Sequence, residues 1–304
     1  MVYFMFCLGL ALLVCGGEML VRNGVKLANK LHISPLLVGI VLMGCGTSLP
    51  ELSTALSSLY STPPMPGLAF GNIIGSNISN ILLILGLSAI ISPMHIGHAG
   101  FRRDGLFLIM SVILFGLVMM FGYMDPVIGA FFVLMILGYF WICHTKEPEP
   151  ENIHINKKNE HSALVLAGLA IGGIAITVYG ADLLVSAASG IARAFGVSES
   201  VIGLTLVAIG TSLPELTVST VAAIHKHSSV AYGNIIGSNI ANILLIVGMM
   251  GIIHPTYVPQ MWNTFWIMVA ATAALLVCGW RGRIHRLVGL AFLCAYAMYI
   301  AYLF

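Results

Sequence analysis

The chain has 304 residues, of which 59% are hydrophobic and 8% are charged, and its formal net charge is +2. A soluble domain carries roughly 25% charged residues, so this composition excludes a soluble globular protein and indicates one that lies almost entirely in a membrane. The mean hydropathy of +1.00 agrees with this. The six cysteines show no metal-ligand spacing and suggest no disulfide framework.

A membrane-spanning helix needs about 20 apolar residues, and ten such segments follow one another along the chain. The first has no basic start and no small-residue cleavage site, which favours a transmembrane helix over a signal peptide. One strongly polar segment, 145–161, divides the chain into a five-helix unit at 1–144 and a second at 162–304. The predicted segments are 2–21, 34–58, 67–92, 104–122, 125–144, 162–186, 198–224, 228–253, 262–280 and 285–303.

The positions of lysine and arginine predict how these helices cross the membrane. If the ten segments alternate in direction, one face holds every basic residue except Arg193. Cytoplasmic loops are enriched in Lys and Arg, so this face and the 145–161 loop are predicted to be cytoplasmic, with both termini outside. The basic residues on this face are Arg22, Lys26, Lys30, Arg102, Arg103, Lys146, Lys157, Lys158, Lys226, Arg281, Arg283 and Arg286.

Two sequence blocks occur once in each unit. Gly-Thr-Ser-Leu-Pro-Glu-Leu stands at 46–52 and 210–216, and Gly-Asn-Ile-Ile-Gly-Ser-Asn-Ile at 71–78 and 233–240. Because each unit has an odd number of helices, the second copy enters the membrane upside down. Inverted-topology repeats with a site near the bilayer midplane are a recurrent architecture of secondary transporters. The predicted fold is therefore an all-α membrane protein of ten transmembrane helices, arranged as two inverted-topology repeats of five.

The repeated blocks place polar side chains four residues apart, and such pairs lie on one face of a helix. An ionisable residue in the hydrocarbon is costly and usually functional, so the two glutamates are the main candidates for a site. Four helices that each present one such pair can enclose a small polar chamber. The pairs are Thr47 with Glu51, Ser76 with Asn80, Thr211 with Glu215, and Ser238 with Asn242.

Pro50 and Pro214 come immediately before the two glutamates and are predicted to break their helices. The carbonyls they free belong to Gly46 and Gly210 and would add oxygen ligands. All the candidate ligands are oxygen atoms, which hard cations such as Ca²⁺ and Na⁺ prefer. Two carboxylates match the charge of one Ca²⁺, and the lack of Lys or Arg in these segments disfavours an anion.

The paired blocks resemble the α-repeats of the Ca²⁺/cation antiporter superfamily, most closely its prokaryotic sodium/calcium exchanger branch. This resemblance implies four ion sites between helices two, three, seven and eight. It implies a central Ca²⁺ site at Glu51 and Glu215, completed by the carbonyls of Thr47 and Thr211. The implied Na⁺ sites are an outward one at Thr211, Ser238, Glu51 and the Ala208 carbonyl, and an inward one at Thr47, Ser76, Glu215 and the Gly44 carbonyl. Asn80 and Asn242 would line the middle of the site, with Ser48 and Ser212 close by.

One departure from the family pattern concerns the coupling ion. Relatives often carry Asp at one of the two middle positions, whereas this chain has Asn80 and Asn242. The missing carboxylate puts K⁺ co-transport and proton holding in doubt, and the Thr-Ser-Leu-Pro sequence before each glutamate favours Na⁺ over H⁺.

The leading hypothesis is an electrogenic antiporter in the plasma membrane that exchanges Ca²⁺ against Na⁺ by alternating access. The alternatives are a Ca²⁺/H⁺ exchanger of the same fold and a cation channel. An enzyme is disfavoured because no His or Asp in the middle of a segment could activate a serine. The implied partners are the lipid bilayer and inorganic cations; no cofactor, nucleic acid or obligate protein partner is implied. Glu18 and Asp182 correspond between the copies, and either an interfacial position or a gating role explains them.

Overall fold

The computed structural model describes residues 1–95, 97–145, 161–197, 208–280 and 282–303. Within these ranges the fold is helical apart from two short strand pairs, and nine helical segments are long and apolar enough to cross a membrane. The predicted seventh segment is described only from residue 208 onward, and its start at 198–207 lies outside the described residues.

The first half contains five helical segments, and the second and third of them are composite. The first segment is α1 (Val2–Leu31). The second consists of α2 (Pro35–Val38), η1 (Gly39–Gly44), α3 (Cys45–Thr47) and α4 (Leu49–Tyr60), and the third of α5 (Pro66–Ser79), η2 (Asn80–Leu85) and α6 (Gly86–Ile91). The fourth and fifth are α7 (His98–Phe121) and α8 (Pro126–Thr145). Here η marks a π-helical stretch, which leaves the ordinary hydrogen-bond ladder and often lies at a functional site.

The second half repeats this arrangement. Its helices are α9 (Ala163–Ala194), α11 (Ala208–Thr211), α12 (Leu213–Ile224), α13 (Ser228–Ala241), η4 (Asn242–Val247), α14 (Gly248–Ile253), α15 (Trp262–Gly279) and α16 (Arg286–Leu303). The π-helical stretches η2 and η4 begin at corresponding residues of the two copies, Asn80 and Asn242.

Three predicted helix ends were wrong: the predictions for α1 and α7 stopped beside charged residues, and that for α9 stopped where small residues follow Val185. Helix α1 continues to Leu31 instead of residue 21, α9 to Ala194 instead of 186, and α7 starts at His98 instead of 104. Arg22, Lys26 and Lys30 therefore lie within α1 rather than in a loop. Lys and Arg are good helix formers, and α1 ends only at Leu31, where His32 adopts the left-handed conformation (φ 54°) as its C-cap.

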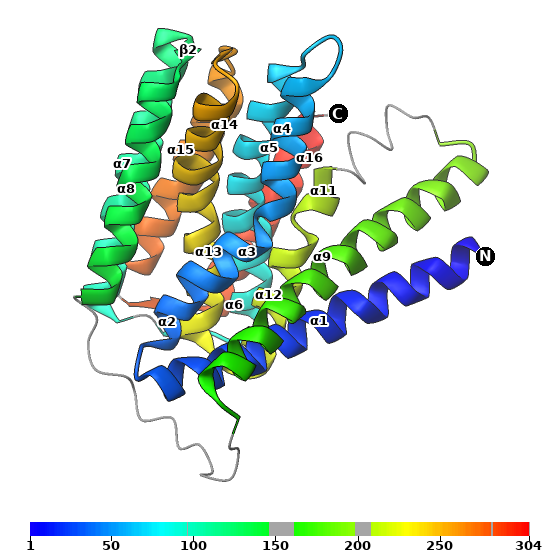
Figure 1. The fold of residues 1–304 in the computed structure, drawn as a ribbon, viewed down its shortest axis with the longest axis vertical. Coiled ribbons are helices and arrows are strands. Elements are labelled where there is room, and N and C mark those ends of the chain that lie inside the picture. The colour runs from blue at the N-terminus through cyan, green and yellow to red at the C-terminus, as the bar shows by residue number, and fades with distance from the viewer. Residues whose placement is uncertain (96, 146–160, 198–207, 281, 304) are drawn as a thin grey trace.

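Helices α1 and α9 pack against each other along a line of glycines and run obliquely to the other helices (Figure 1). A Cβ on Gly16 would lie 2.5 Å from the Thr177 nitrogen, and one on Gly173 would lie 2.7 Å from the Leu20 nitrogen. At 1.5 Å per residue a 30-residue helix is about 45 Å long, against a hydrocarbon core of about 30 Å. The oblique orientation accommodates this excess length.

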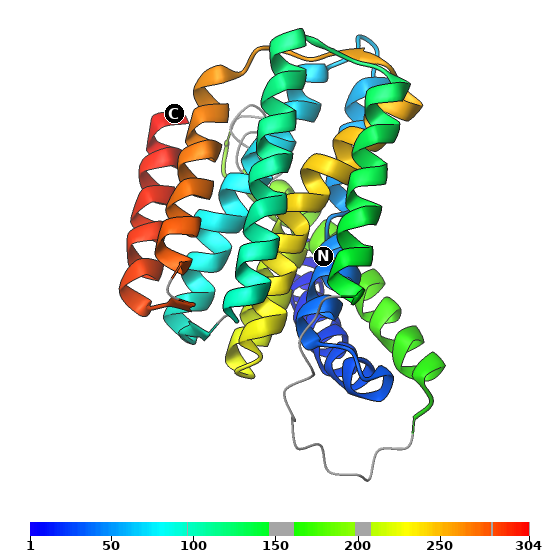
Figure 2. The same cartoon turned by 90° about the vertical axis from the view of Figure 1, so that its left-hand side faces the viewer.

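The remaining helices form an upright bundle around the second, third and eighth segments (Figure 2). A close contact joins η1 to α13, where a Cβ on Gly44 would lie 2.8 Å from the Ser238 nitrogen. Small residues allow transmembrane helices to approach this closely. Helix α8 packs on α14, and α16 packs on α6. These two contacts are equivalent, because each joins the fifth segment of one half to the third segment of the other.

Two short antiparallel strand pairs mark the two ends of the bundle. Strand β1 (Met94–His95) pairs with β4 (Arg283–Ile284), and β2 (Tyr123–Met124) pairs with β3 (Thr256–Tyr257). In each pair, the strand that follows the third helix of one half meets the strand between the fourth and fifth helices of the other half. We call these the β1–β4 end and the β2–β3 end of the molecule. Arg283 lies at the β1–β4 end, the face that the distribution of Lys and Arg predicts to be cytoplasmic.

The two copies offer a matched test of the η1–α13 contact. We expect Gly237→Ala to lower the free energy of unfolding by about 1–3 kcal/mol, since overpacking at a rigid contact costs that much. The added Cβ would lie 2.6 Å from the Ile40 carbonyl oxygen, a backbone atom that cannot move aside alone. Thermal unfolding in detergent measures this. Gly75→Ala, the same change in the other copy, is the control, because a Cβ there meets no atom of the described chain within 4 Å. Equal destabilisation by both changes would contradict the expectation.

Candidate functional site

The second segment and its counterpart are interrupted one residue after the threonine of each repeated block. Ser48 (φ −84°, ψ 6°) separates α3 from α4, and Ser212 (φ −89°, ψ 1°) separates α11 from α12. Proline is the second residue of both following helices, a position where its missing N–H costs no helical hydrogen bond. The interruption places Glu51 and Glu215 in the first turn of α4 and α12.

The two glutamate side chains are buried and come together from the two halves of the chain. Glu51 is 1% exposed and Glu215 is fully buried. The Ser48 hydroxyl, on the Glu51 side, donates a hydrogen bond of 3.1 Å to Oε1 of Glu215. The Ser76 hydroxyl lies 3.5 Å from Oε1 of Glu51. The carboxylates therefore face one polar chamber between α4, α5 and α12.

A pair of threonine–asparagine contacts crosses between the halves on either side of the chamber. The Thr47 hydroxyl lies 3.3 Å from Oδ1 of Asn234, and the Thr211 hydroxyl lies 3.3 Å from Oδ1 of Asn72. The second and eighth segments are thus linked in the same way as the seventh and third. Asn234 and Asn72 therefore cross-link the two halves of the chain.

The middle of the chamber is lined with amides. Asn80 Nδ2 donates to Oδ1 of Asn239 at 3.2 Å, and Asn242 is fully buried. Asn239 was not among the candidates, although it occupies the same place in its repeated block as Asn77. Asn77 itself donates to the Ile73 carbonyl at 2.8 Å instead, so the two halves use the same residue differently.

The structure also pairs two candidates that the family resemblance assigned to different ion sites. The Ser238 hydroxyl donates to the Gly44 carbonyl at 3.1 Å, across the η1–α13 contact. Ala208 begins α11, next to the residues outside the described ranges. Pro50 and Pro214 lie beside the chamber in the interrupted helices.

Several buried oxygen atoms at the chamber have no hydrogen-bond partner in the described part of the chain. They are Oε2 of Glu51, Oε2 of Glu215, Oδ1 of Asn80, Oδ1 of Asn242 and Oγ of Ser212. Buried polar groups are almost always paired, and an unpaired buried carboxylate is especially costly. A hard cation coordinated by these oxygens removes that cost.

The same donor set disfavours a transition-metal site. Across the described ranges, no group of three or more His, Cys, Asp or Glu side chains is close enough to hold a metal ion. Carboxylate, hydroxyl and amide oxygens suit Na⁺ or Ca²⁺, whereas zinc and copper prefer imidazole and thiolate.

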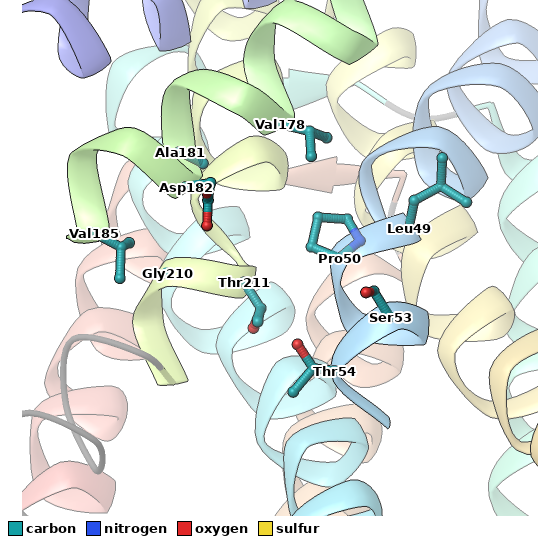
Figure 3. Close-up of a pocket in the computed structure, with 10 residues that line it drawn as sticks. All are labelled: Leu49, Pro50, Ser53, Thr54, Val178, Ala181, Asp182, Val185, Gly210 and Thr211. Carbon is teal, nitrogen blue, oxygen red and sulfur yellow. The ribbon is translucent and has the colours of Figure 1, made fainter. Parts of the chain in front are cut away.

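A cavity of about 430 Å³ approaches the chamber from the β2–β3 end. Figure 3 shows Val178 and Asp182 of α9 on one side, and Pro50, Thr54 and Thr211 on the other. Pro50 precedes Glu51 in the chain and Thr211 contacts Asn72 across the site, so the cavity borders residues of the site. Among the ten residues that line it, Asp182 alone is charged.

Comparison with known proteins shows similarity along the whole chain. The family described as "Sodium/calcium exchanger protein" matches residues 1–145 and 165–304. An uncharacterized membrane protein of Methanocaldococcus jannaschii is 37% identical and covers 97% of this chain and 96% of its own length. The sodium/calcium exchanger MaX1 of Methanosarcina acetivorans is 31% identical over 99% of this chain and 98% of its own. A solved structure of the sodium-calcium exchanger NCX_Mj, soaked with 10 mM Na⁺ and zero Ca²⁺, superposes with a TM-score of 0.84 at 35% identity and covers 99% of both chains.

The asparagine cross-links give a test of the site's packing. Asn234 also donates to the Ser219 hydroxyl at 2.8 Å and to the Glu215 carbonyl at 3.3 Å, whereas Nδ2 of Asn72 has no partner in the described chain. A typical intramolecular hydrogen bond contributes about 1 kcal/mol, so we expect Asn234→Ala to destabilise by about 2–3 kcal/mol and Asn72→Ala by about 1 kcal/mol. Thermal unfolding of the two variants side by side checks this. A larger loss from Asn72→Ala would refute the assigned contacts.

Proposed function

The chain belongs to the sodium/calcium exchanger family, and we propose that it exchanges Ca²⁺ against Na⁺ across the cell membrane by alternating access to the chamber around Glu51 and Glu215. The observation that carries this proposal is the pair of buried carboxylates, one from each half, whose Oε2 atoms have no partner in the described chain. Cations supply the missing partners, and each transport cycle replaces one kind of cation by the other.

The architecture we propose is an inverted repeat of the units 1–144 and 162–304, joined by the 145–161 segment on the cytoplasmic side. The two strand pairs support it, because exchanging the halves converts the β1–β4 pair into the β3–β2 pair at the opposite end of the molecule. The β1–β4 end is then cytoplasmic and the β2–β3 end external. Both termini lie outside, as the distribution of Lys and Arg requires.

The ion ligands we assign follow from which oxygens reach the chamber. Ca²⁺ binds between Glu51 and Glu215, with the carbonyls of Thr47 and Thr211 completing its shell. Na⁺ ions share the two carboxylates with the hydroxyl and carbonyl oxygens on either side. Those further Na⁺ ligands are Ser76, Ser238, Gly44, Ala208, Thr47 and Thr211, while Asn80, Asn242, Ser48 and Ser212 bound the middle of the chamber.

The charge of the chamber makes the exchange electrogenic. Two ionised carboxylates are neutralised by one Ca²⁺, and Asn80 and Asn242 add no charge. Three Na⁺ ions in the same chamber leave one positive charge in excess. An exchange of three Na⁺ for one Ca²⁺ therefore moves one net charge across the membrane.

The two approaches to the chamber differ in a way that supports alternating access. At the external side, the 430 Å³ cavity reaches Pro50 and Thr211. At the cytoplasmic side, the glycine contacts between η1 and α13 leave no room for an added methyl group. The α1–α9 pair carries none of the assigned ligands, and α9 lines the cavity. We assign the moving part to this pair, which slides across a bundle that keeps the ions in place.

Neutralising either glutamate tests the assignment of the chamber. Removing one partner from a buried charge pair costs about 3–5 kcal/mol, which corresponds to about a 100-fold or greater loss of apparent Ca²⁺ affinity. We therefore expect Glu51→Gln and Glu215→Gln each to abolish Na⁺-gradient-driven uptake of radiolabelled Ca²⁺ into proteoliposomes. The control is Asp125→Asn, which changes a carboxylate that caps α8 outside the chamber. Undiminished uptake by Glu51→Gln would defeat the proposal.

Membrane voltage and pH separate the exchanger from its alternatives. One net charge moved through about 60 mV is worth about 1.4 kcal/mol, a tenfold change in an equilibrium ratio. In Na⁺-loaded vesicles, an inside-positive shift of that size should raise the final internal-to-external Ca²⁺ ratio about tenfold. A voltage-independent ratio would exclude net charge movement. Ca²⁺ uptake driven by a pH jump in Na⁺-free vesicles would instead indicate proton coupling, and single-channel conductance would indicate a channel.

A further inference from the structure

A charged contact joins α1 to the turn between α12 and α13, away from the ion chamber. Nε2 of His225 lies 2.9 Å from Oε1 and 2.8 Å from Oε2 of Glu18. Arg22, one helical turn further along α1, also forms a salt bridge with Glu18. The side chains of Glu18 and His225 are 30% and 35% exposed.

The turn that holds His225 has only three residues, His225 to His227, between the two helices. Lys226 has φ of 59°, in the left-handed region that non-glycine residues rarely adopt, and His227 donates its backbone N–H to the Ala222 carbonyl at 2.8 Å. This tight turn fixes the His225 side chain toward α1. Nearby, a Cβ on Gly17 would lie 2.9 Å from Cγ2 of Thr217, so α1 contacts α12 directly beside the charged pair.

The corresponding positions in the other half form a different contact. Glu18 corresponds to Asp182, and His225 corresponds to Ser61, each 164 residues away. Asp182 lines the open cavity, and Ser61 donates to the carbonyls of Ser58 and Pro63 in its own turn. The side of the chamber that is closed therefore has an acid–histidine pair, whereas the corresponding residues of the open side, Asp182 and Ser61, form no such pair within the described chain.

We infer that Glu18 and His225 form a cytoplasmic gate contact, which holds α1 against the α12–α13 turn while the chamber is open to the outside and must break before it opens to the cytoplasm. This inference rests on the proposed alternating access. The contact strengthens when His225 is protonated, because the positive imidazolium then faces the Glu18 carboxylate. Acid on the cytoplasmic side therefore favours the outward-open conformation. The counterpart of this contact on the external side, Asp182 with Ser61, lacks the histidine, so the bias is one-sided.

The other charged groups around the contact leave His225 as the group that responds to pH. Arg22 stays positive at every physiological pH, since guanidinium does not lose its proton in proteins. Helices α2 and α13 carry no charged residue; the other charges on α9 and α12 are Asp182, Arg193 and Glu215, and Lys226 stands beside His225 in the turn. His227 is a second histidine, with its ring centroid 6.3 Å from that of His225. Burial, together with the charge of His225, lowers the pKa of His227.

The test measures Ca²⁺ uptake by Na⁺-loaded inside-out membrane vesicles, in which the bath reaches the cytoplasmic face. Histidine gains its proton over the range from about pH 8 to about pH 6. Stabilising the conformation closed to the bath reduces the fraction of carriers able to bind there and raises the half-saturating Ca²⁺ concentration in proportion. The response compared is the rise in the half-saturating Ca²⁺ concentration when the bath pH falls from about 8 to about 6. For a partly exposed ion pair we expect this rise to be about threefold larger in the wild type than in His225→Gln. Any proton effect on the chamber itself is common to both proteins and cancels.

Matched variants distinguish a gate contact from a general packing role. Glu18→Gln and the double variant Glu18→Gln/His225→Gln should behave like His225→Gln, because each removes the same interaction. His227→Gln should keep the wild-type response. In right-side-out vesicles, where the bath reaches the external face, the wild type and His225→Gln should respond to bath pH alike.

The outcomes separate the gate contact from the proposed function. If His225→Gln keeps the wild-type pH response while Na⁺-dependent Ca²⁺ uptake is normal, the gate contact is wrong and the exchanger stands. If no protein shows Na⁺-dependent uptake at any pH, both fall. A response lost equally in His227→Gln would also overturn the role of His225.

Discussion

Two carboxylates buried in a membrane protein, each with an oxygen that the described chain leaves unpaired, are the constraint on which the rest of this structure depends. Each must be held where cations reach it, because an isolated buried charge is too costly to persist. Proline and serine interrupt the helices so that both glutamates stand in a first turn. Serine hydroxyls then contact the carboxylates without supplying a positive charge of their own. A fixed lysine or arginine would satisfy the carboxylates permanently, and no cation would be needed in its place.

Glycine contacts hold together two groups of helices, which in the proposed mechanism are the part that binds the ions and the part that moves. The η1–α13 contact joins backbone directly to backbone, and Gly44 and Gly237 both belong to it. The α1–α9 contact is equally close, with Gly16 of one helix and Gly173 of the other at its centre. These two helices therefore behave as one unit, although they begin the two halves of the chain. A pair of helices that slides across the bundle can make only a few contacts that are specific to one position. The Glu18–His225 contact is specific to one position in this way.

Much of this arrangement was predictable from the sequence, and what was not has identifiable physical causes. The repeated blocks located the helix interruptions and both buried glutamates, because ionisable groups are costly in hydrocarbon and rarely occur there without a functional role. The ends of α1 and α9 were missed, since a hydropathy window stops at charged residues such as Arg22 in α1 and at the small residues after Val185 in α9, and neither of these ends the helix. Asn239 was missed as the partner of Asn80, because the sequence repeats Asn77 and Asn239 identically and cannot tell which of them turns toward the chamber. The contact of His225 with Glu18 depends on the path of a tight turn, which periodicity does not encode.

Comparing the two copies residue by residue separates two kinds of asymmetry. Where the residues are identical and their contacts differ, the difference reflects the conformation. The Ser48 hydroxyl donates a hydrogen bond to Glu215, while the Ser212 hydroxyl has no partner in the described chain. Such differences should exchange between the halves when the chamber opens to the other side.

Where the residues themselves differ, the asymmetry is built into the chain and cannot be exchanged. Ser219, which accepts a hydrogen bond from Asn234, corresponds to Ala55, and His225 corresponds to Ser61. Ser219 adds a hydrogen bond between α12 and α13, and His225 adds a contact between α1 and the turn that follows α12. This turn lies on the side predicted to be cytoplasmic. The two conformations of an exact repeat would have equal energy, so the positions at which the copies differ, these two among them, decide which conformation the proposed carrier prefers when it is empty. An exchanger that faces outward at rest presents its chamber to the side from which Na⁺ is drawn.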